Sequence, residues 1–330
     1  MDHELKSATR SHFSRLGLMY FIGSLIIYGL QVVISLIVNS TNPDLLENIN
    51  YTLLIMMLPT YCIAMPLTIF LICKFVPAKQ IEKKKMSVGQ WIVAFIISMA
   101  GMYLSNIIGL ILTQVIGVIK GNPVSNAMVD ISTSTNLWLN LVIMVLLAPV
   151  FEEILFRKLI VDSTVKYGEG TAVLISGLMF GLFHGNLNQF AYAFVLGVIF
   201  AFVYVKTGTI RYTIFLHMAV NFIGSVLSVW VIGLVDLDAL EMASGDPEYM
   251  MEFMTTHLPQ FAAYMLYMFA LFGLVIAGII LFFVNKKKVH LNPGEISIPK
   301  GSRFSTAVIN VGMVLYSIFW IAMIVIQILQ

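Results

Sequence analysis

The stretch Ala148-Pro-Val-Phe-Glu-Glu-Ile-Leu-Phe-Arg157 places two glutamates and an arginine inside an apolar run that begins at Leu137. An ionised side chain in a bilayer costs on the order of 2.5–3.5 kcal/mol even on the lenient insertion scale. Charged residues in a membrane span are therefore functional candidates by default. If the run spans a membrane, this stretch predicts both the fold and the position of a site.

The composition is that of a membrane protein. The chain has 330 residues, of which 59% are hydrophobic and 11% are charged, and its mean hydropathy is +0.92. A soluble core does not need so much apolar surface. We therefore expect a multi-pass protein of the cell membrane with the lipid bilayer around it. The net charge of +2 gives no reason to expect a nucleic-acid partner.

Apolar runs predict an all-α polytopic helix bundle of about nine spans. Runs of about 20 residues, the length that crosses a bilayer, cover 17–38, 51–73, 91–119, 189–205, 211–233, 261–284 and 304–329. Segments 137–166 and 170–184 bring the count to nine, or to eight if the short second segment does not cross. Pro59, Pro66 and Pro149 predict kinks within their spans.

The basic residues predict that the N-terminus is cytoplasmic, because cytoplasmic loops collect Lys and Arg. With nine spans and the N-terminus inside, 1–16, 74–90, 157–169, 206–211 and 285–303 face the cytoplasm. These segments hold every basic residue except Lys120. The outer loop at 234–261 is acidic and rich in Met. It is interpreted either as a solvated loop or as an interfacial helix or lid.

Helical spacing divides the charged stretch into two parts. Residues four apart share a helix face, so Glu153 and Arg157 are expected to pair. Glu152 points elsewhere and is left without a local counter-charge. A carboxylate in such surroundings suits a general base. The sequence therefore assigns a structural role to Glu153 and a chemical role to Glu152.

Partners for Glu152 must be neutral, because the other predicted spans contain no Asp, Glu, Lys or Arg apart from Arg211 at the cytoplasmic edge of its span. His184, His217 and Asn221 are the candidates. In one arrangement Glu152, His184 and His217 bind Zn²⁺, which activates water. In the other, Glu152 and His184 activate water directly, and His217 and Asn221 donate hydrogen bonds to an oxyanion. Spacing does not decide between the two.

Each feature also has a simpler interpretation. An intramembrane histidine such as His184 or His217 can be a packing or relay residue. Asn221 can join two helices through its amide. The glutamate pair can be the proton site of a transporter, although no inverted repeat is present to support that alternative.

Together, three motifs resemble those of the CAAX protease and bacteriocin-processing (CPBP or Abi) family of intramembrane proteases, which includes the type II CAAX prenyl endopeptidases. The motifs are Glu152-Glu-x-x-x-Arg157, Phe180-x-x-x-His184 and His217-x-x-x-Asn221, and they occur in that order. The resemblance extends over about 100 residues, within 137–233.

The resemblance implies an intramembrane endopeptidase that hydrolyses a peptide bond near the cytoplasmic side. It implies that Glu152 and His184 activate water, that His217 and Asn221 form the oxyanion site, and that Glu153 with Arg157 supports the site. The family is commonly labelled metalloprotease, so zinc remains open. The substrate is a peptide or protein, lipidated in the prenyl-processing branch. A bacteriocin-immunity or partner-binding protein without catalysis is the alternative, and the oligomeric state is open.

On this basis the chain is divided into three parts. Residues 1–136 hold the first three spans, 137–233 form the catalytic core of four spans, and 234–330 hold the acidic outer loop and two last spans.

Overall fold

The computed structural model describes residues 3–235, 240–241 and 245–329. Over these residues it is helical and contains no strand. Eight helices are long and apolar enough to cross a membrane: Glu4–Thr41, Ile49–Phe75, Val88–Lys120, Leu137–Tyr167, Leu187–Thr207, Ile210–Ile232, Leu258–Lys288 and Val311–Leu329. The predicted all-α multi-pass bundle is confirmed, and the ninth predicted span is a shorter apolar helix, Glu169–Phe183.

The elements follow one another in two halves. The first half contains α1 (His3–Thr41), α2 (Asp44–Glu47), α3 (Ile49–Pro59), η1 (Thr60–Ala64), α4 (Met65–Phe75), α5 (Val88–Lys120), α6 (Ala127–Ser134), α7 (Leu137–Leu139), η2 (Asn140–Leu147), α8 (Ala148–Glu152), η3 (Glu153–Leu159), α9 (Ile160–Thr164) and η4 (Val165–Tyr167). The second contains α10 (Glu169–Phe183), α11 (Leu187–Thr207), α12 (Ile210–Phe222), η5 (Ile223–Leu227), α13 (Ser228–Ile232), α15 (Pro247–Thr256), α16 (Leu258–Asn285), η6 (Lys286–Lys288), η7 (Lys300–Ser302), α17 (Arg303–Ala307) and α18 (Val311–Leu329).

Local sequence sets where the helices begin and end. Ser87 and Gln90 form a reciprocal capping box at the start of α5, which satisfies two backbone donors. Gly121 ends the same helix in the left-handed conformation, with φ +81°. Gly208, with φ +56°, ends α11 in the same way.

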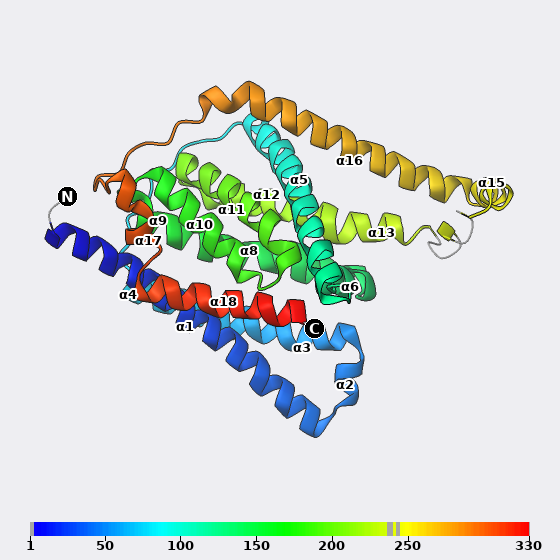
Figure 1. Cartoon of the computed structure of the whole chain (residues 1–330), viewed down its shortest axis with the longest axis horizontal. Coiled ribbons are helices and arrows are strands. Elements are labelled where there is room, and N and C mark those ends of the chain that lie inside the picture. The colour runs from blue at the N-terminus through cyan, green and yellow to red at the C-terminus, as the bar shows by residue number, and fades with distance from the viewer. Residues whose placement is uncertain (1–2, 236–239, 242–244, 330) are drawn as a thin grey trace.

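The central layer consists of α10 and α11 packed against each other (Figure 1). On one side α5 covers α11, and α16 packs on α5 at the edge of the bundle. On the other side α1 and α18 pack together, and α18 also contacts α10. The core between these layers is aromatic and includes Phe156, Phe180, Tyr316 and Trp320. The segment that carries the intramembrane charges is therefore enclosed by other helices.

Wide turns interrupt two of the long helices where prolines occur. Pro59 precedes the π-helical segment η1, and Pro66 follows it in the first turn of α4. Pro149 lies in the first turn of α8, directly after the π-helical segment η2. Proline clashes with the carbonyl four residues before it in a regular α-helix. The disturbance predicted at these prolines takes the form of π-helical turns, which recur at functional sites.

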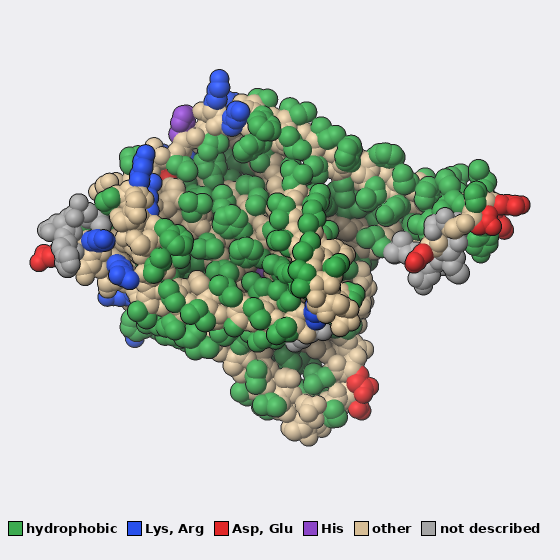
Figure 2. Space-filling view, in the orientation of Figure 1, with side chains coloured by type: hydrophobic (Ala, Val, Ile, Leu, Met, Phe, Trp, Pro, Cys, Tyr) green, Lys and Arg blue, Asp and Glu red, His purple; other side chains and the backbone are tan. Residues whose placement is uncertain are grey.

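Charge separates along the bundle. Figure 2 shows Lys and Arg side chains mainly at the end that holds the N-terminus, and Asp and Glu mainly at the opposite end. This separation follows the pattern used to orient the chain, and the cytoplasmic N-terminus stays a prediction. In the predicted outer loop, Pro247–Thr256 form α15, whereas 236–239 and 242–244 lie outside the described residues.

Close contact between α1 and α18 depends on glycine. A Cβ on Gly17 would lie 2.3 Å from the backbone nitrogen of Met313, and a Cβ on Gly312 would lie 1.8 Å from the carbonyl oxygen of Ser14. Real Cβ atoms do not approach other atoms so closely, and the atoms in the way are backbone. The two helices can therefore cross at this distance only with glycine at both positions.

We expect Gly17→Leu to destabilise the protein because it separates α1 from α18. Overpacking typically costs about 1–3 kcal/mol, and a backbone obstacle makes relaxation harder. Gly29→Leu is the matched control, because no atom lies within 4 Å of a Cβ at this position of the same helix. The measurement is the thermal unfolding midpoint in detergent, and equal midpoints for the two variants would contradict the packing argument.

Candidate active site

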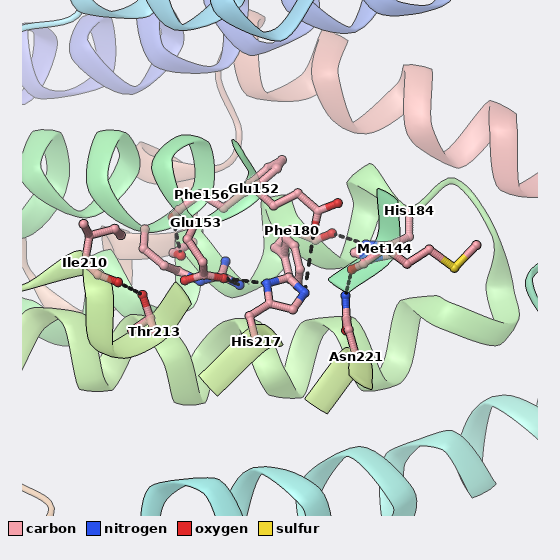
Figure 3. A network of polar contacts seen from close by, with 12 residues as sticks. Met144, Glu152, Glu153, Phe156, Phe180, His184, Ile210, Thr213, His217 and Asn221 are labelled. Carbon is pink, nitrogen blue, oxygen red and sulfur yellow. Dashed lines mark hydrogen bonds and ion pairs between the residues drawn. The ribbon is translucent and has the colours of Figure 1, made fainter. Parts of the chain in front are cut away.

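The predicted site residues come from three neighbouring parts of the bundle (Figure 3). Glu152 ends α8, and Glu153 opens the π-helical segment η3. His184 directly follows α10, and His217 and Asn221 lie one turn apart on α12. Each of these elements falls between residues 137 and 233, so the charged stretch and the two histidine motifs meet in space.

Glu153 and Arg157 form a fully buried ion pair. Nη2 of Arg157 lies 3.0 Å from Oε1 of Glu153, and both side chains have 0% exposure. The Cζ atom of Arg157 also lies 4.1 Å from the centroid of the Phe180 ring, in a cation–π contact. The contact predicted from helical spacing is present, although the segment is π-helical. A buried pair of this kind neutralises two charges that could not be buried singly.

His217 lies between the two glutamates. Its Nδ1 is 3.0 Å from Oε1 of Glu153, and its Nε2 is 3.7 Å from Oε2 of Glu152. A carboxylate accepts hydrogen bonds, so Nδ1 of His217 carries the donated hydrogen. Neutral His217 would then turn the Nε2 lone pair toward the Glu152 oxygen. Two lone pairs repel each other, so the contact between Nε2 of His217 and Oε2 of Glu152 is favourable only when a proton is bound to one of these two atoms.

The two glutamates differ in exposure. The Glu153 side chain is fully buried, whereas the Glu152 side chain retains 14% exposure. Glu152 is thus the more accessible acid of the pair.

His184 is held in one tautomer by the backbone. Its Nδ1 lies 2.8 Å from the carbonyl oxygen of Phe180, and a carbonyl only accepts, so Nδ1 donates. The Nε2 atom of neutral His184 is therefore a hydrogen-bond acceptor. No hydrogen bond to this atom occurs within the described part of the chain. His184 can accept a proton or a hydrogen bond from a molecule that enters the site.

Phe180 contacts three of the polar residues. Its ring lies edge-on to His184 and to His217, with centroid distances of 4.7 and 5.8 Å, and Arg157 lies over its face. The side chain is 1% exposed. Phe180 therefore fixes the relative positions of the residues around it through packing, besides binding His184 through its carbonyl.

Asn221 donates a hydrogen bond from Nδ2 to the carbonyl oxygen of Met144, at 2.8 Å. Met144 lies in the π-helical segment η2, so this bond joins two spans. The role of Asn221 as a link between helices, one of the two interpretations of the sequence, thus has a geometric basis. An amide nitrogen carries two hydrogens, and the second stays available to another acceptor.

The arrangement differs from the sequence-based mechanism in one respect. That mechanism joins Glu152 to His184, whereas the Glu152 carboxylate lies beside Nε2 of His217. The sequence also gives no indication of Tyr61, a buried residue whose ring stacks on Phe151, the residue before Glu152, with centroids 5.5 Å apart. The span at 51–73 contains no charged residue, so nothing in the sequence marked Tyr61 as a candidate site residue.

The zinc arrangement requires Glu152, His184 and His217 to converge on one point. Within the described ranges, no three side chains of His, Cys, Asp or Glu are grouped so that they could hold a metal ion. Nδ1 of His184 donates a hydrogen bond to the carbonyl oxygen of Phe180, and Nδ1 of His217 donates one to the carboxylate of Glu153. Nε2 of each histidine is left as the atom that could bind a metal, but the three side chains are not grouped as a three-ligand site in the described part of the chain.

Removing one member of the buried ion pair is expected to destabilise the protein. Arg157→Met leaves Glu153 charged and buried, which costs about 3–5 kcal/mol. Adding Glu153→Gln to Arg157→Met removes the unpaired charge, so the double variant should recover part of the loss. The measurement is the free energy of unfolding in detergent micelles. A double variant less stable than Arg157→Met alone would contradict the pairing.

Comparison with known proteins identifies the part of the chain that holds this site. Residues 134–223 match the family described as type II CAAX prenyl endopeptidase Rce1-like. The chain is also 28% identical over 165 residues to a protein of Bacillus subtilis (strain 168) named "Putative membrane peptidase YdiL". That alignment covers 48% of this chain and 66% of the relative, just under two thirds of its length. No solved structure matches the chain.

All three motifs lie within the matched residues 134–223. The resemblance drawn from Glu152-Glu-x-x-x-Arg157, Phe180-x-x-x-His184 and His217-x-x-x-Asn221 is therefore confirmed. The segment that builds the site is similar to the type II CAAX prenyl endopeptidases, and it lies within a multi-pass membrane protein.

Proposed function

We propose that the protein is an intramembrane endopeptidase that hydrolyses a peptide bond with water activated by Glu152. The observation that carries this proposal is the position of Glu152, a partly exposed carboxylate beside His217 within the segment similar to the CAAX endopeptidases. Neither a serine nor a cysteine nucleophile is needed for this chemistry.

Water activation is the first step of the proposed reaction. A water molecule donates one hydrogen bond to Glu152 and one to Nε2 of His184, the ring atom left as an acceptor by the Phe180 carbonyl. Glu152 takes a proton from this water as the oxygen attacks the carbonyl carbon of the peptide. Positioned general bases contribute typically about 10²–10⁴-fold to such a step.

The attack moves the carbonyl π electrons onto oxygen, which needs hydrogen-bond donors. The free amide hydrogen of Asn221 is one donor. His217 supplies a second through Nε2, which takes the proton shared with Glu152 at rest and so leaves Glu152 ionised, and Glu153 stabilises the imidazolium through its contact with Nδ1. Fixed donors at a developing oxyanion are commonly the largest single contribution to catalysis.

Collapse of the tetrahedral intermediate completes the reaction. The carbonyl re-forms, the C–N bond breaks, and Glu152 returns the proton it took from water to the leaving amine. Arg157 and Glu153 take no part in proton transfer and keep His217 in place. Their role is positional, in agreement with their complete burial.

The substrate is proposed to be a peptide or protein cleaved near the cytoplasmic side, as the resemblance to CAAX endopeptidases implies. A prenylated substrate is the form that the family description suggests. The alternative is an immunity or partner-binding protein with the same fold and no catalysis. A transporter that relays protons through Glu152 and Glu153 is disfavoured, because Glu153 is paired with Arg157.

We expect Glu152→Gln to lower the cleavage rate by about 10²–10⁴-fold without loss of stability, because the amide cannot accept the proton. The assay is cleavage of internally quenched peptides that end in a CAAX sequence, with and without a farnesyl group, in proteoliposomes. Glu47→Gln is the matched control, since this exposed carboxylate lies far along the chain from the site.

Full cleavage by Glu152→Gln would overturn the assignment of the base. A cellular phenotype that survives Glu152→Gln, in a protein without measurable cleavage, would favour the partner-binding alternative.

Chelation is expected to leave the cleavage rate unchanged, because the donor atoms of Glu152, His184 and His217 do not converge on a metal. The purified active protein is treated with a strong zinc chelator, the chelator is removed, and the peptide assay is repeated. Loss of activity that added Zn²⁺ restores would contradict the metal-free mechanism.

A further inference from the structure

A second polar feature lies at the end of the bundle predicted to face the cytoplasm, outside the candidate active site. It is a cavity of about 570 Å³. Its lining includes five basic residues from three separate elements: Lys83, Lys84, Lys85, Lys158 and Arg211. The three consecutive lysines belong to the segment between α4 and α5, Lys158 belongs to η3, and Arg211 belongs to the first turn of α12.

The positive charge of this cavity is only partly neutralised. Lys158 pairs with Asp162 at 3.2 Å, and Lys84 pairs with Glu82 at 3.6 Å. The other three bases form no ion pair among the described residues. Five bases and two acids leave three positive charges around one cavity. An anionic ligand in the cavity would neutralise this excess positive charge.

The walls of the cavity are fixed by hydrogen bonds. The backbone N–H of Lys84 donates to the carbonyl of Thr207 at 2.7 Å. The N–H of Met86 donates to the hydroxyl of Tyr212 at 3.2 Å. A Cβ on Gly208 would lie 2.4 Å from the carbonyl oxygen of Glu82, so the segment lies directly on the turn between α11 and α12. The lysines are therefore held over the cavity and do not belong to a free loop.

The first turn of α12 adds a further contribution. Thr209 lines the cavity and precedes α12, and its hydroxyl donates to the carbonyl of Thr207 and does not cap an N–H group of the helix. The first N–H groups of a helix have no partner within the helix, and they favour anions. This effect strengthens a site that the basic side chains already define.

Exposed apolar residues continue from the cavity into the predicted bilayer. Phe215 lies one turn beyond Arg211 on α12 and is 58% exposed. On α5, which packs on α12, Val88 and Ile92 are 76% and 45% exposed. The site thus combines positive charge at the membrane surface with an apolar flank beneath it. This combination fits a molecule with an anionic headgroup and acyl chains better than it fits a soluble anion.

We infer that this cavity binds the phosphate headgroup of an anionic phospholipid from the cytoplasmic leaflet. The phosphate lies among Lys83, Lys85 and Arg211, and the acyl chains lie along the exposed faces of α5 and α12. Anionic lipids gather basic segments at the cytoplasmic surface, and basic pockets at helix ends bind their headgroups. The inference does not depend on proteolysis by the neighbouring site.

The test compares two triple variants, each of which removes three positive charges from segments predicted to face the cytoplasm. Lys83→Gln/Lys85→Gln/Arg211→Gln changes the cavity. Lys286→Gln/Lys287→Gln/Lys288→Gln changes a basic turn that does not line it. The purified full chain in neutral detergent is titrated with fluorescently labelled phosphatidylglycerol and with labelled phosphatidylcholine. Inorganic phosphate serves as the competitor.

We expect the unaltered protein and the 286–288 variant to bind phosphatidylglycerol more tightly than phosphatidylcholine. The cavity variant should bind phosphatidylglycerol at least about tenfold more weakly, because each basic residue near a surface contributes substantially to anionic lipid binding. Its thermal unfolding midpoint without added lipid shows that it is folded.

Three results would overturn the inference. Equal weakening in both triple variants would mean that overall surface charge attracts the lipid. Equal affinity for the two lipids would remove the role of the anionic headgroup. Full displacement of the lipid by an equimolar amount of inorganic phosphate would show that the cavity binds the free anion and makes no use of acyl chains.

Discussion

The ion pair between Glu153 and Arg157 is the interaction on which the site depends. Both side chains are fully buried among apolar residues, where either charge alone would be too costly. Once paired, Glu153 can hold the Nδ1 hydrogen of His217, and Arg157 can lie over the ring of Phe180. Three helical segments are thereby joined around two charges. Removal of the pair would release the histidine and the aromatic ring together.

The net charge of the buried site residues explains why they bind one additional proton. Glu152, Glu153 and Arg157 together with neutral His217 carry one net negative charge in an apolar interior. A proton shared between Glu152 and Nε2 of His217 makes the group neutral. Neutral clusters are far less costly to bury than charged ones. In the proposed hydrolysis this proton stays on Nε2 of His217, whereas Glu152 takes a second proton from water and returns it to the leaving amine.

The sequence predicted the bundle because a bilayer demands long apolar helices, and runs of about 20 residues are visible in any sequence. It also selected Glu152, His184, His217 and Asn221, because such residues are rare in membrane spans. It could not predict which histidine contacts which glutamate. That contact depends on the rotation of α12 against α8 and on π-helical turns, which simple 3.6-residue spacing does not describe.

The π-helical segment η3 connects the two polar regions of the molecule. Glu153 and Arg157 point from it into the core, whereas the next residue, Lys158, lines the basic cavity. Lys158 also pairs with Asp162, which accepts a hydrogen bond from Tyr204 of α11 at 2.9 Å. A short segment therefore carries both the support of the candidate active site and one wall of the cavity. Any movement of η3 that a ligand in the cavity causes would reach Glu153, and through Glu153 the ring of His217.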